Sequence, residues 1–153
     1  MQPPLVTVIV PYMNPRRVLL AQKTINDITK QNYRPLEVIV VNGTGNKIIN
    51  NEKSYSEADP SIEFVEILTQ HENAAVSRNS AIRAASGDWV ISADNDDWSH
   101  ESRIEYQMAR RQQGVPCLLR SQVRVDISGL WTNTLPGNSV TPAVMLADNP
   151  NGI

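Results

Sequence analysis

Two short apolar runs, rich in β-branched residues, constrain the fold of this chain more than any other feature. They are Leu5 to Val10 and Leu36 to Val41, each with a single polar residue inside it, Thr7 and Glu37. Strands with one wet face alternate apolar and polar residues, whereas strands buried on both faces are apolar throughout. Both runs are therefore predicted to be central strands of a parallel sheet, and the first is predicted to stop at Pro11.

Helix signals separate these strands from two further ones. Asn14-Pro15 has the N-cap residue and the proline expected at a helix start, and apolar residues follow at helical spacing to about Gln31. A second helix is predicted over Asn73 to Ser86, with Gly87 as its stop. The remaining predictions are strands at Ile62 to Leu68 and Trp89 to Ala93, a short helix or loop within 46–60, a helix from His100 to Gln113 capped by Ser99, one or two strands within Val115 to Val125, and a turn-rich region over 126–153.

Strands that alternate with helices indicate an α/β fold, with a mostly parallel, Rossmann-like sheet flanked by helices. We expect one domain over residues 1–153 and the strand order 3-2-1-4. Such sheets bind ligands beyond the carboxyl ends of the strands, where the strand order reverses. The reversal then lies between the first and fourth strands, so Pro11-Tyr12 and Asp94 to Asp97 would flank one crevice, with Asn42 and Gly43 beside it.

Charge and composition narrow the classes of partner. The net charge is −2, which argues against nucleic acid or an anionic membrane surface as the main partner. No apolar run approaches the roughly 20 residues of a membrane span, and residues 1–4 have no signal-peptide character. A cytoplasmic location is expected. Cys117 is the one cysteine, so an internal disulfide is excluded.

Three carboxylates follow the fourth predicted strand, in the sequence Asp94-Asn95-Asp96-Asp97. In an extended chain, Asp94 and Asp96 point to the same side and would repel each other unless a cation lies between them. Hard oxygen ligands suit Mg²⁺ or Mn²⁺, which keep positions open for phosphate oxygens. The alternative is a solvated acidic turn before a helix. A calcium loop of the EF-hand type is excluded, because Trp98 stands at the fifth ligand position and the sixth position has no glycine.

Asn73 and Arg78 lie at the start of the second clear helix. Arg78 is predicted to neutralise a phosphate or to pair with a carboxylate of the acidic segment. The alternative is a surface arginine on an alanine-rich helix. Gly43 and Gly45 do not form a dinucleotide fingerprint, because the third glycine is missing and the loop follows the second strand.

Four segments in order resemble the N-terminal part of family 2 inverting glycosyltransferases of the GT-A fold. They are Val6 to Asn14, Glu37 to Thr44, Asn73 to Gly87, which contains Ser77-Arg78-Asn79, and Ala93 to Trp98, and the resemblance covers about residues 5 to 113. It implies a metal-assisted transfer of a sugar from a nucleotide-diphosphate sugar, with a UDP-sugar as the expected partner.

The resemblance also implies residue roles. Pro11 and Tyr12 match positions that touch the base, Asn42 and Gly43 match a pair of acids of which one usually binds the base, Asp94 matches a carboxylate near the ribose and phosphates, and Asp96 matches the metal ligand. The whole set expected to bind the donor nucleotide is Pro11, Tyr12, Asn14, Asn42, Gly43, Asn73, Arg78, Asp94, Asn95 and Asp96, with Asp96 and Asp94 as the ligands of Mn²⁺ or Mg²⁺.

The family's catalytic base is an acid in the acceptor-binding half, and the sole acid after Asp126 is Asp148, which does not match that motif. The chain is therefore expected to lack the acceptor half, to bind a donor with little or no transfer, and to self-associate through apolar surface within 115–146. Two alternatives are a non-catalytic nucleotide-sugar-binding module and a nucleotidyltransferase. The second is disfavoured, because Tyr12 to Pro15 stand where a glycine-rich loop would be needed.

Overall fold

The computed structural model describes residues 2–49, 52–70 and 73–111, together with the backbone of four short strands further along the chain. The chain divides into two compact units, Met1–Glu101 and Ser102–Ile153, which are described separately below.

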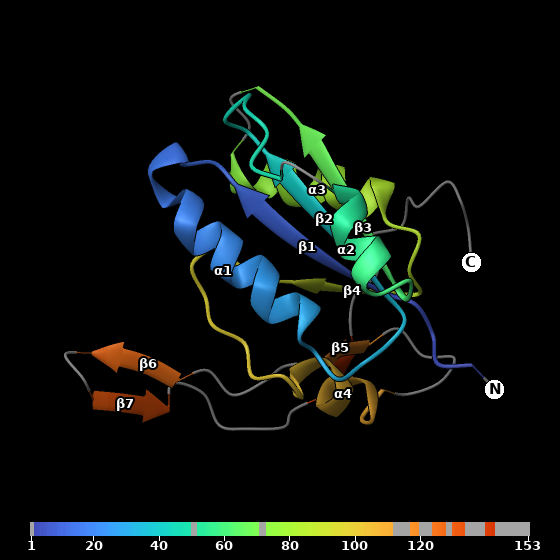
Figure 1. Ribbon diagram of the computed structural model, residues 1–153. Coiled ribbons are helices and arrows are strands. Elements are labelled where there is room, and N and C mark those ends of the chain that lie inside the picture. The colour runs from blue at the N-terminus through green and yellow to red at the C-terminus, as the bar shows by residue number, and fades with distance from the viewer. Residues whose placement is uncertain are drawn as a thin grey trace. The chain divides into compact units, whose positions relative to one another are not determined.

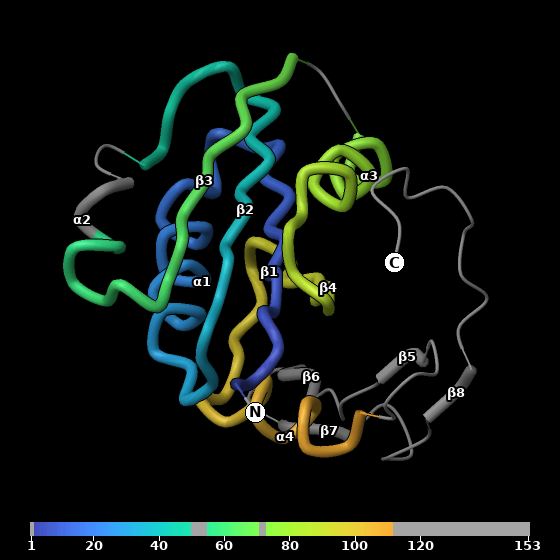
Figure 2. Tube along the Cα trace, turned by 90° about the vertical axis from the view of Figure 1, so that its right-hand side faces the viewer, coloured from blue at the N-terminus to red at the C-terminus, as the bar shows by residue number. Residues whose placement is uncertain are grey.

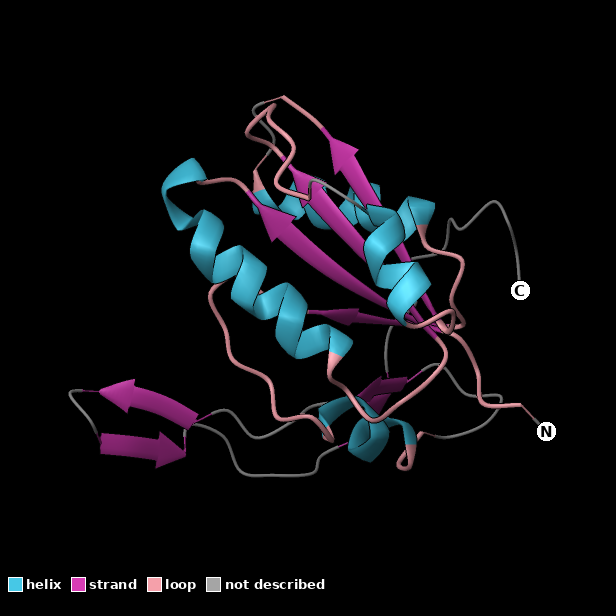
Figure 3. Ribbon diagram, viewed as in Figure 1, coloured by secondary structure: helices cyan, strands magenta, loops and turns pink. Residues whose placement is uncertain are grey.

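The first unit is built on a four-stranded sheet with the order β3-β2-β1-β4 (Figures 1 and 3). All its neighbouring strands are parallel. The strands are β1 (Val6–Tyr12), β2 (Leu36–Asn42), β3 (Ile62–Leu68) and β4 (Trp89–Ser92). The predicted α/β class, the parallel sheet and the strand order 3-2-1-4 are confirmed.

Helices connect consecutive strands and cover both faces of the sheet. A 3-10 turn, η1 (Pro15–Arg17), leads into α1 (Val18–Thr29), and α2 (Glu52–Ala58) and α3 (Ala74–Ala84) follow. Figure 2 shows α1 and α2 on one side of the sheet and α3 on the other. Crossovers on both faces place the strand reversal between β1 and β4, as expected for a doubly wound sheet.

The core lies along β1 and β2, in which every residue is buried. On one face, Ile9, Ile39 and Val41 pack with Ala81 of α3. On the other face, the Phe64 ring stacks on Tyr55 of α2, with the ring centroids 4.8 Å apart. The continuous apolarity of these strands therefore reflects helices on both sides.

Strand β4 differs from its neighbours, because its residues alternate between half-buried and exposed. It has four residues and pairs with β1 alone among the described strands. The mixed sequence of β4, Trp-Val-Ile-Ser, is typical of a partly buried edge strand, whereas the continuous apolar runs of β1 and β2 are typical of central strands.

The prediction that the first strand stops at Pro11 is wrong, because β1 continues to Tyr12. The carbonyl of Ile9 accepts from Ala93 on the β4 side, and the carbonyl of Tyr12 accepts from Gly43 on the β2 side. Alternate residues of β1 thus bond to opposite neighbours, and Pro11 faces the side on which β4 has already ended. Its missing N–H therefore costs no bond to β2, and the pairing of β1 with β4 ends at Ile9 and Ser92.

Gly87 does not end a helix by a left-handed conformation. The helix α3 ends at Ala84, and Ala85 is already extended. A Cβ at Gly87 would lie 2.6 Å from Thr7 Oγ1 and 2.7 Å from the Thr7 nitrogen. The glycine is required because the chain that enters β4 passes against the backbone of β1.

The second unit contains α4 (Arg103–Met108) and two antiparallel strand pairs. The strands β5 (Cys117–Leu119) and β8 (Val140–Pro142) form one pair, and β6 (Arg124–Ile127) and β7 (Leu130–Asn133) form the other. The region predicted as turn-rich thus includes strands. Side chains within 115–146, on which the expected self-association depends, and those of Cys117, Asp126 and Asp148 lie outside the described part.

The helix predicted from His100 begins later, at Arg103. The carbonyl of His100 accepts from Gln31 Nε2 at 2.8 Å, and that of Glu101 accepts from the Asn32 nitrogen at 2.8 Å. These two carbonyls accept from residues at and after the end of α1, so they are not available for helical bonds, and His100 and Glu101 lie before the start of α4. Across the described residues, no helix has both the length and the apolar character needed to cross a bilayer.

Candidate functional site

The carboxyl ends of the parallel strands bring most of the predicted site residues to one edge of the sheet. Pro11 and Tyr12 end β1, Asn42 ends β2, and Asp94 follows β4 after one intervening residue. Figure 3 shows the loops that follow β1, β2 and β3 at the same end of the sheet. This edge includes the point between β1 and β4 where the strand order reverses.

The acidic segment forms a turn at Asn95 and Asp96, and the Asp97 nitrogen donates to the Asp94 carbonyl at 3.2 Å. The predicted extended chain from Asp94 to Asp96 is therefore wrong, because this segment is a turn. Asn95 Nδ2 donates to the Pro11 carbonyl at 2.8 Å, and Thr24 Oγ1 donates to the Asp97 carbonyl at 3.1 Å. The turn is thus fixed to the end of β1 and to α1.

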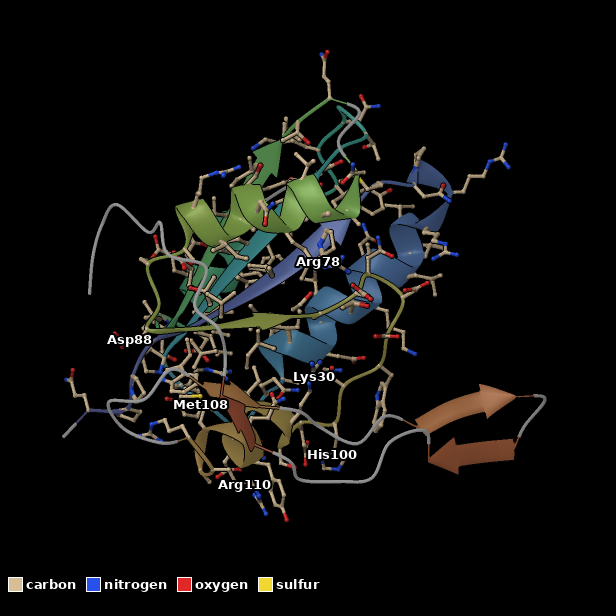
Figure 4. All side chains as sticks on the ribbon, turned by 180° about the vertical axis from the view of Figure 1, so that it is seen from behind. Lys30, Arg78, Asp88, His100, Met108 and Arg110 are labelled. Atoms are coloured by element: carbon tan, nitrogen blue, oxygen red, sulfur yellow. The ribbon has the colours of Figure 1, made fainter. Side chains whose placement is uncertain are left out.

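Two arginines from different helical elements pair with the two aspartates. Arg78 Nη2 donates to Asp94 Oδ1 at 2.5 Å, and its Nε donates to Ser92 Oγ at 3.2 Å. Figure 4 shows the Arg78 side chain pointing from α3 toward the loop after β4, with Asp88 at the opposite end of that strand. Arg17, from η1, forms an ion pair with Asp96. The pairing of Arg78 with the acidic segment was one of its predicted roles, whereas Arg17 was not predicted.

All four charged side chains remain open to solvent. Asp94 and Asp96 are 50% and 38% exposed, and Arg78 and Arg17 are 36% and 49% exposed. Within these two pairs, the charges of the two carboxylates are balanced by those of the two guanidinium groups. Exposed ion pairs are each worth about 0.2–1 kcal/mol and exchange partners readily.

Asn42 is completely buried, and its amide is committed to the loop after β2. Its Nδ2 donates to the Asn46 carbonyl and to Glu66 Oε1, both at 2.7 Å. Its Oδ1 accepts from the Thr44 nitrogen at 2.9 Å and from Thr44 Oγ1 at 2.7 Å. In this structure Asn42 orders the loop, and its contact with a base stays a prediction that requires one of these bonds to break.

Glu66 of β3 is a further organising residue that the sequence did not single out. Its carboxylate accepts from the nitrogens of Ile48 at 3.0 Å and Ile49 at 3.2 Å, besides Asn42. Burial, and then the negative charge of Glu66, raise the pKa of the Tyr12 phenol above its ordinary value. The available signal was a strand, Ile62–Leu68, with two acidic residues among apolar ones, Glu63 and Glu66.

The other predicted residues have local roles in the described structure. Asn14 caps η1 by accepting from the Arg16 nitrogen at 3.0 Å. Asn73 caps α3 by accepting from the nitrogens of Ala75 and Val76. The Gly43 nitrogen donates to the Tyr12 carbonyl at 2.8 Å. Ligand contacts by Asn14, Asn73 and Gly43 stay predictions.

The donor set of the acidic turn suits a hard divalent cation. Asp94 and Asp96 offer carboxylate oxygens within three residues, and both side chains are accessible. No cluster of three or more histidine, cysteine, aspartate or glutamate side chains arranged for a metal occurs in the part of the chain that the structure describes. Two protein carboxylates with open positions fit a cation that completes its shell with water and phosphate, as Mg²⁺ and Mn²⁺ do.

Comparison with known proteins identifies the class of molecule that this architecture resembles. The model of the family described as Glycosyl transferase family 2 matches residues 7–140. The glycosyltransferase GlyA of Streptococcus pneumoniae serotype 4 is 36% identical over 104 residues, which are 65% of this chain and 14% of GlyA. The uncharacterized glycosyltransferase YwdF of Bacillus subtilis is 29% identical over 81 residues, which are 53% of this chain and 29% of YwdF. The chain therefore spans less than a third of either relative.

Solved structures give the same fold. The mannosyltransferase PcManGT from Pyrobaculum calidifontis, in complex with GDP-Man and Mn²⁺, superposes with a TM-score of 0.61 and 25% identity. The match covers 78% of this chain and 37% of PcManGT. Residues 1–349 of TarS from S. aureus, in complex with UDP-GlcNAc, give a TM-score of 0.55 at 21% identity, over 68% of this chain and 30% of that one.

Proposed function

The chain belongs to glycosyl transferase family 2, and from this premise we propose that its sheet edge binds the nucleotide-sugar donor of a glycosyl transfer reaction. One observation carries the proposal. The Asp94–Asp96 turn lies at the strand-order reversal with a guanidinium group paired to each carboxylate. Accessible carboxylates and arginines at this place match what a metal-bound diphosphate requires.

The proposed donor site divides into a base end and a diphosphate end. The base end is formed by Pro11 and Tyr12, with the loop that Asn42 and Glu66 hold in place. The diphosphate end is formed by Asp94 and Asp96, which would hold Mn²⁺ or Mg²⁺. The Mn²⁺ and GDP-Man named with PcManGT support the use of a divalent ion with a nucleotide sugar, and the UDP-GlcNAc named with TarS supports a UDP-sugar as the first donor to test.

Transfer is proposed as a single displacement at the anomeric carbon with inversion, in which the nucleoside diphosphate leaves. The divalent ion, when bound, neutralises the charge that develops on the departing diphosphate. The chain's own part is to orient the donor through the β1 and β4 ends, with Arg78 held against Ser92 and Asp94. Deprotonation of the acceptor hydroxyl is assigned to none of the described residues. We therefore expect this chain by itself to bind donor with little or no transfer, and a time course of sugar transfer would overturn that expectation.

Calorimetric titration of UDP and of GDP, each with and without Mn²⁺, tests the proposed donor site. Wild type should bind UDP in a Mn²⁺-dependent manner, and Asp96→Asn should weaken that binding about tenfold or more, because a metal ligand is lost. The matched control is Asp88→Asn, an equivalent change at the other end of β4 (Figure 4). Equal loss in both variants, or wild-type binding that ignores Mn²⁺, would refute the assignment of the diphosphate end.

A further inference from the structure

Arg17 and Arg78 hold the two aspartates in different ways. Arg78 is anchored twice, through Asp94 and through Ser92 Oγ, and it extends from α3, whose N-terminus is capped by Asn73. Arg17 is anchored in the structure by its ion pair with Asp96. It belongs to a three-residue turn that buries none of its residues, and its side chain is 49% exposed. A movement of the Arg17 side chain therefore breaks fewer side-chain contacts than a movement of Arg78.

The position of Arg17 puts it in competition with a cation. A carboxylate oxygen of Asp96 that accepts from a guanidinium is less available to a metal, and the positive charge beside it repels a divalent ion. In the absence of ligand, Arg17 therefore lowers the affinity of Asp96 for metal. When a metal takes Asp96, the released guanidinium remains beside the site, and a diphosphate offers it oxygens that match its planar fork.

Resting on the proposed function, we propose that Arg17 is a latch that exchanges partners. It pairs with Asp96 in the free protein and with the donor diphosphate once the divalent ion has bound. The exchange makes metal and nucleotide binding mutually dependent, and by linkage each must strengthen the other by the same factor. The inference assigns to Arg17 a positioning role toward the nucleoside diphosphate and an opposing role toward the metal alone.

Removal of Arg17 should move two affinities in opposite directions. In Arg17→Ala, Mn²⁺ alone should bind about two- to fivefold more tightly, the range expected for losing one exposed ion pair. UDP at saturating Mn²⁺ should bind about tenfold more weakly, because a charge-assisted hydrogen bond to phosphate is lost. A purely structural role would weaken both. Mn²⁺ binding is read from the loss of the free-ion electron paramagnetic resonance signal, and UDP binding from calorimetry.

Two further variants complete the test. Arg16→Ala removes the same charge from the same turn and should leave both affinities within twofold of wild type. Arg17→Lys keeps the charge without the fork, so it should restore the wild-type Mn²⁺ affinity and recover UDP binding only in part. If wild type binds no Mn²⁺–UDP at all, the proposed function falls and the latch with it. If wild type binds Mn²⁺ and UDP, but Arg17→Ala does not bind Mn²⁺ more tightly and has the same affinities as Arg16→Ala, the latch alone is refuted.

Discussion

The two ends of the central sheet each carry carboxylates, but the carboxylates are held in opposite ways. At the amino end Glu37 is 4% exposed, and it accepts from Thr7 Oγ1 at 2.5 Å and from the nitrogen and hydroxyl of Ser86 at 2.9 Å and 2.5 Å. At the carboxyl end, Asp94 and Asp96 are 50% and 38% exposed and each pairs with one arginine.

This difference separates structural from exchangeable charge. The partners of Glu37 are neutral donors from β1 and from the segment before β4, so its bonds connect three parts of the chain across the sheet. The partners of Asp94 and Asp96 are long cationic side chains at the surface, which solvent or a ligand replaces at little cost. A buried carboxylate with several fixed donors stabilises the fold, whereas a half-exposed carboxylate beside a guanidinium is available for binding.

The largest effect on stability is expected from Glu37→Ala. Loss of the carboxylate leaves the buried Thr7 hydroxyl without its acceptor and opens a void, so the free energy of unfolding should fall by about 2–4 kcal/mol. Glu63→Ala is the control, because Glu63 is the exposed register partner of Glu37 on β3. Urea unfolding measures both, and a Glu37→Ala loss no larger than that of the control would break the comparison.

A smaller loss in the free energy of unfolding is expected from Gly87→Ala, which adds a methyl group at the same end of the sheet. The new methyl group would meet Thr7 at 2.6–2.7 Å, and relief requires β1 and the start of β4 to separate. Overpacking of this kind costs about 1–3 kcal/mol. Asp88→Ala, one residue further on, is the control and should leave the free energy of unfolding nearly unchanged, as measured by urea unfolding. A neutral Gly87→Ala would mean that the close approach is not needed for stability.

The smallest effect on stability is expected at the carboxyl end. Asp94→Asn should change the free energy of unfolding by about 0.5 kcal/mol or less, since the Arg78 side chain that loses its ion pair stays hydrated. The same variant should weaken Mn²⁺-dependent UDP binding clearly. Unfolding and calorimetry on one preparation give both values. A large loss of stability with unchanged binding would reverse the roles assigned to the two ends.

Much of the fold follows from local pattern. The strands β1 and β2 were predictable because continuous β-branched runs have few alternatives, and helix signals between strands led to the parallel order. The Asn14 cap was predicted because a cap depends on neighbours within three residues, whereas Asn73, predicted as the first residue of a helix, is instead its N-cap. The length of β1 was not predictable, since β1 continues past Pro11 through its pairing with β2, which the sequence of β1 alone does not show.

The site was predictable in its place but not in its contacts. The strand ends indicated which segments meet, whereas the ion pair of Arg17 with Asp96 joins residues 79 positions apart and depends on tertiary structure. A turn in the acidic segment was the stated alternative to an extended chain, but the bond from the Asn95 side chain to Pro11, across the sheet edge, was not predictable. Glu66 was missed because its partners are backbone nitrogens of an irregular loop, which no residue pattern marks.

The most direct test of the whole account uses Mn²⁺ as a local probe in nuclear magnetic resonance of the ¹⁵N-labelled chain with UDP. Bound Mn²⁺ broadens nearby amide signals. The account predicts selective broadening of the amides of Asp94 to Asp97 and of the β1 end near Tyr12, with the signals of Glu37 and Ser86 to Asp88 left sharp. Broadening centred on the amino end, or none beyond that caused by Mn²⁺ free in solution, would contradict the central claim that the carboxyl end of this sheet binds the metal and the nucleotide.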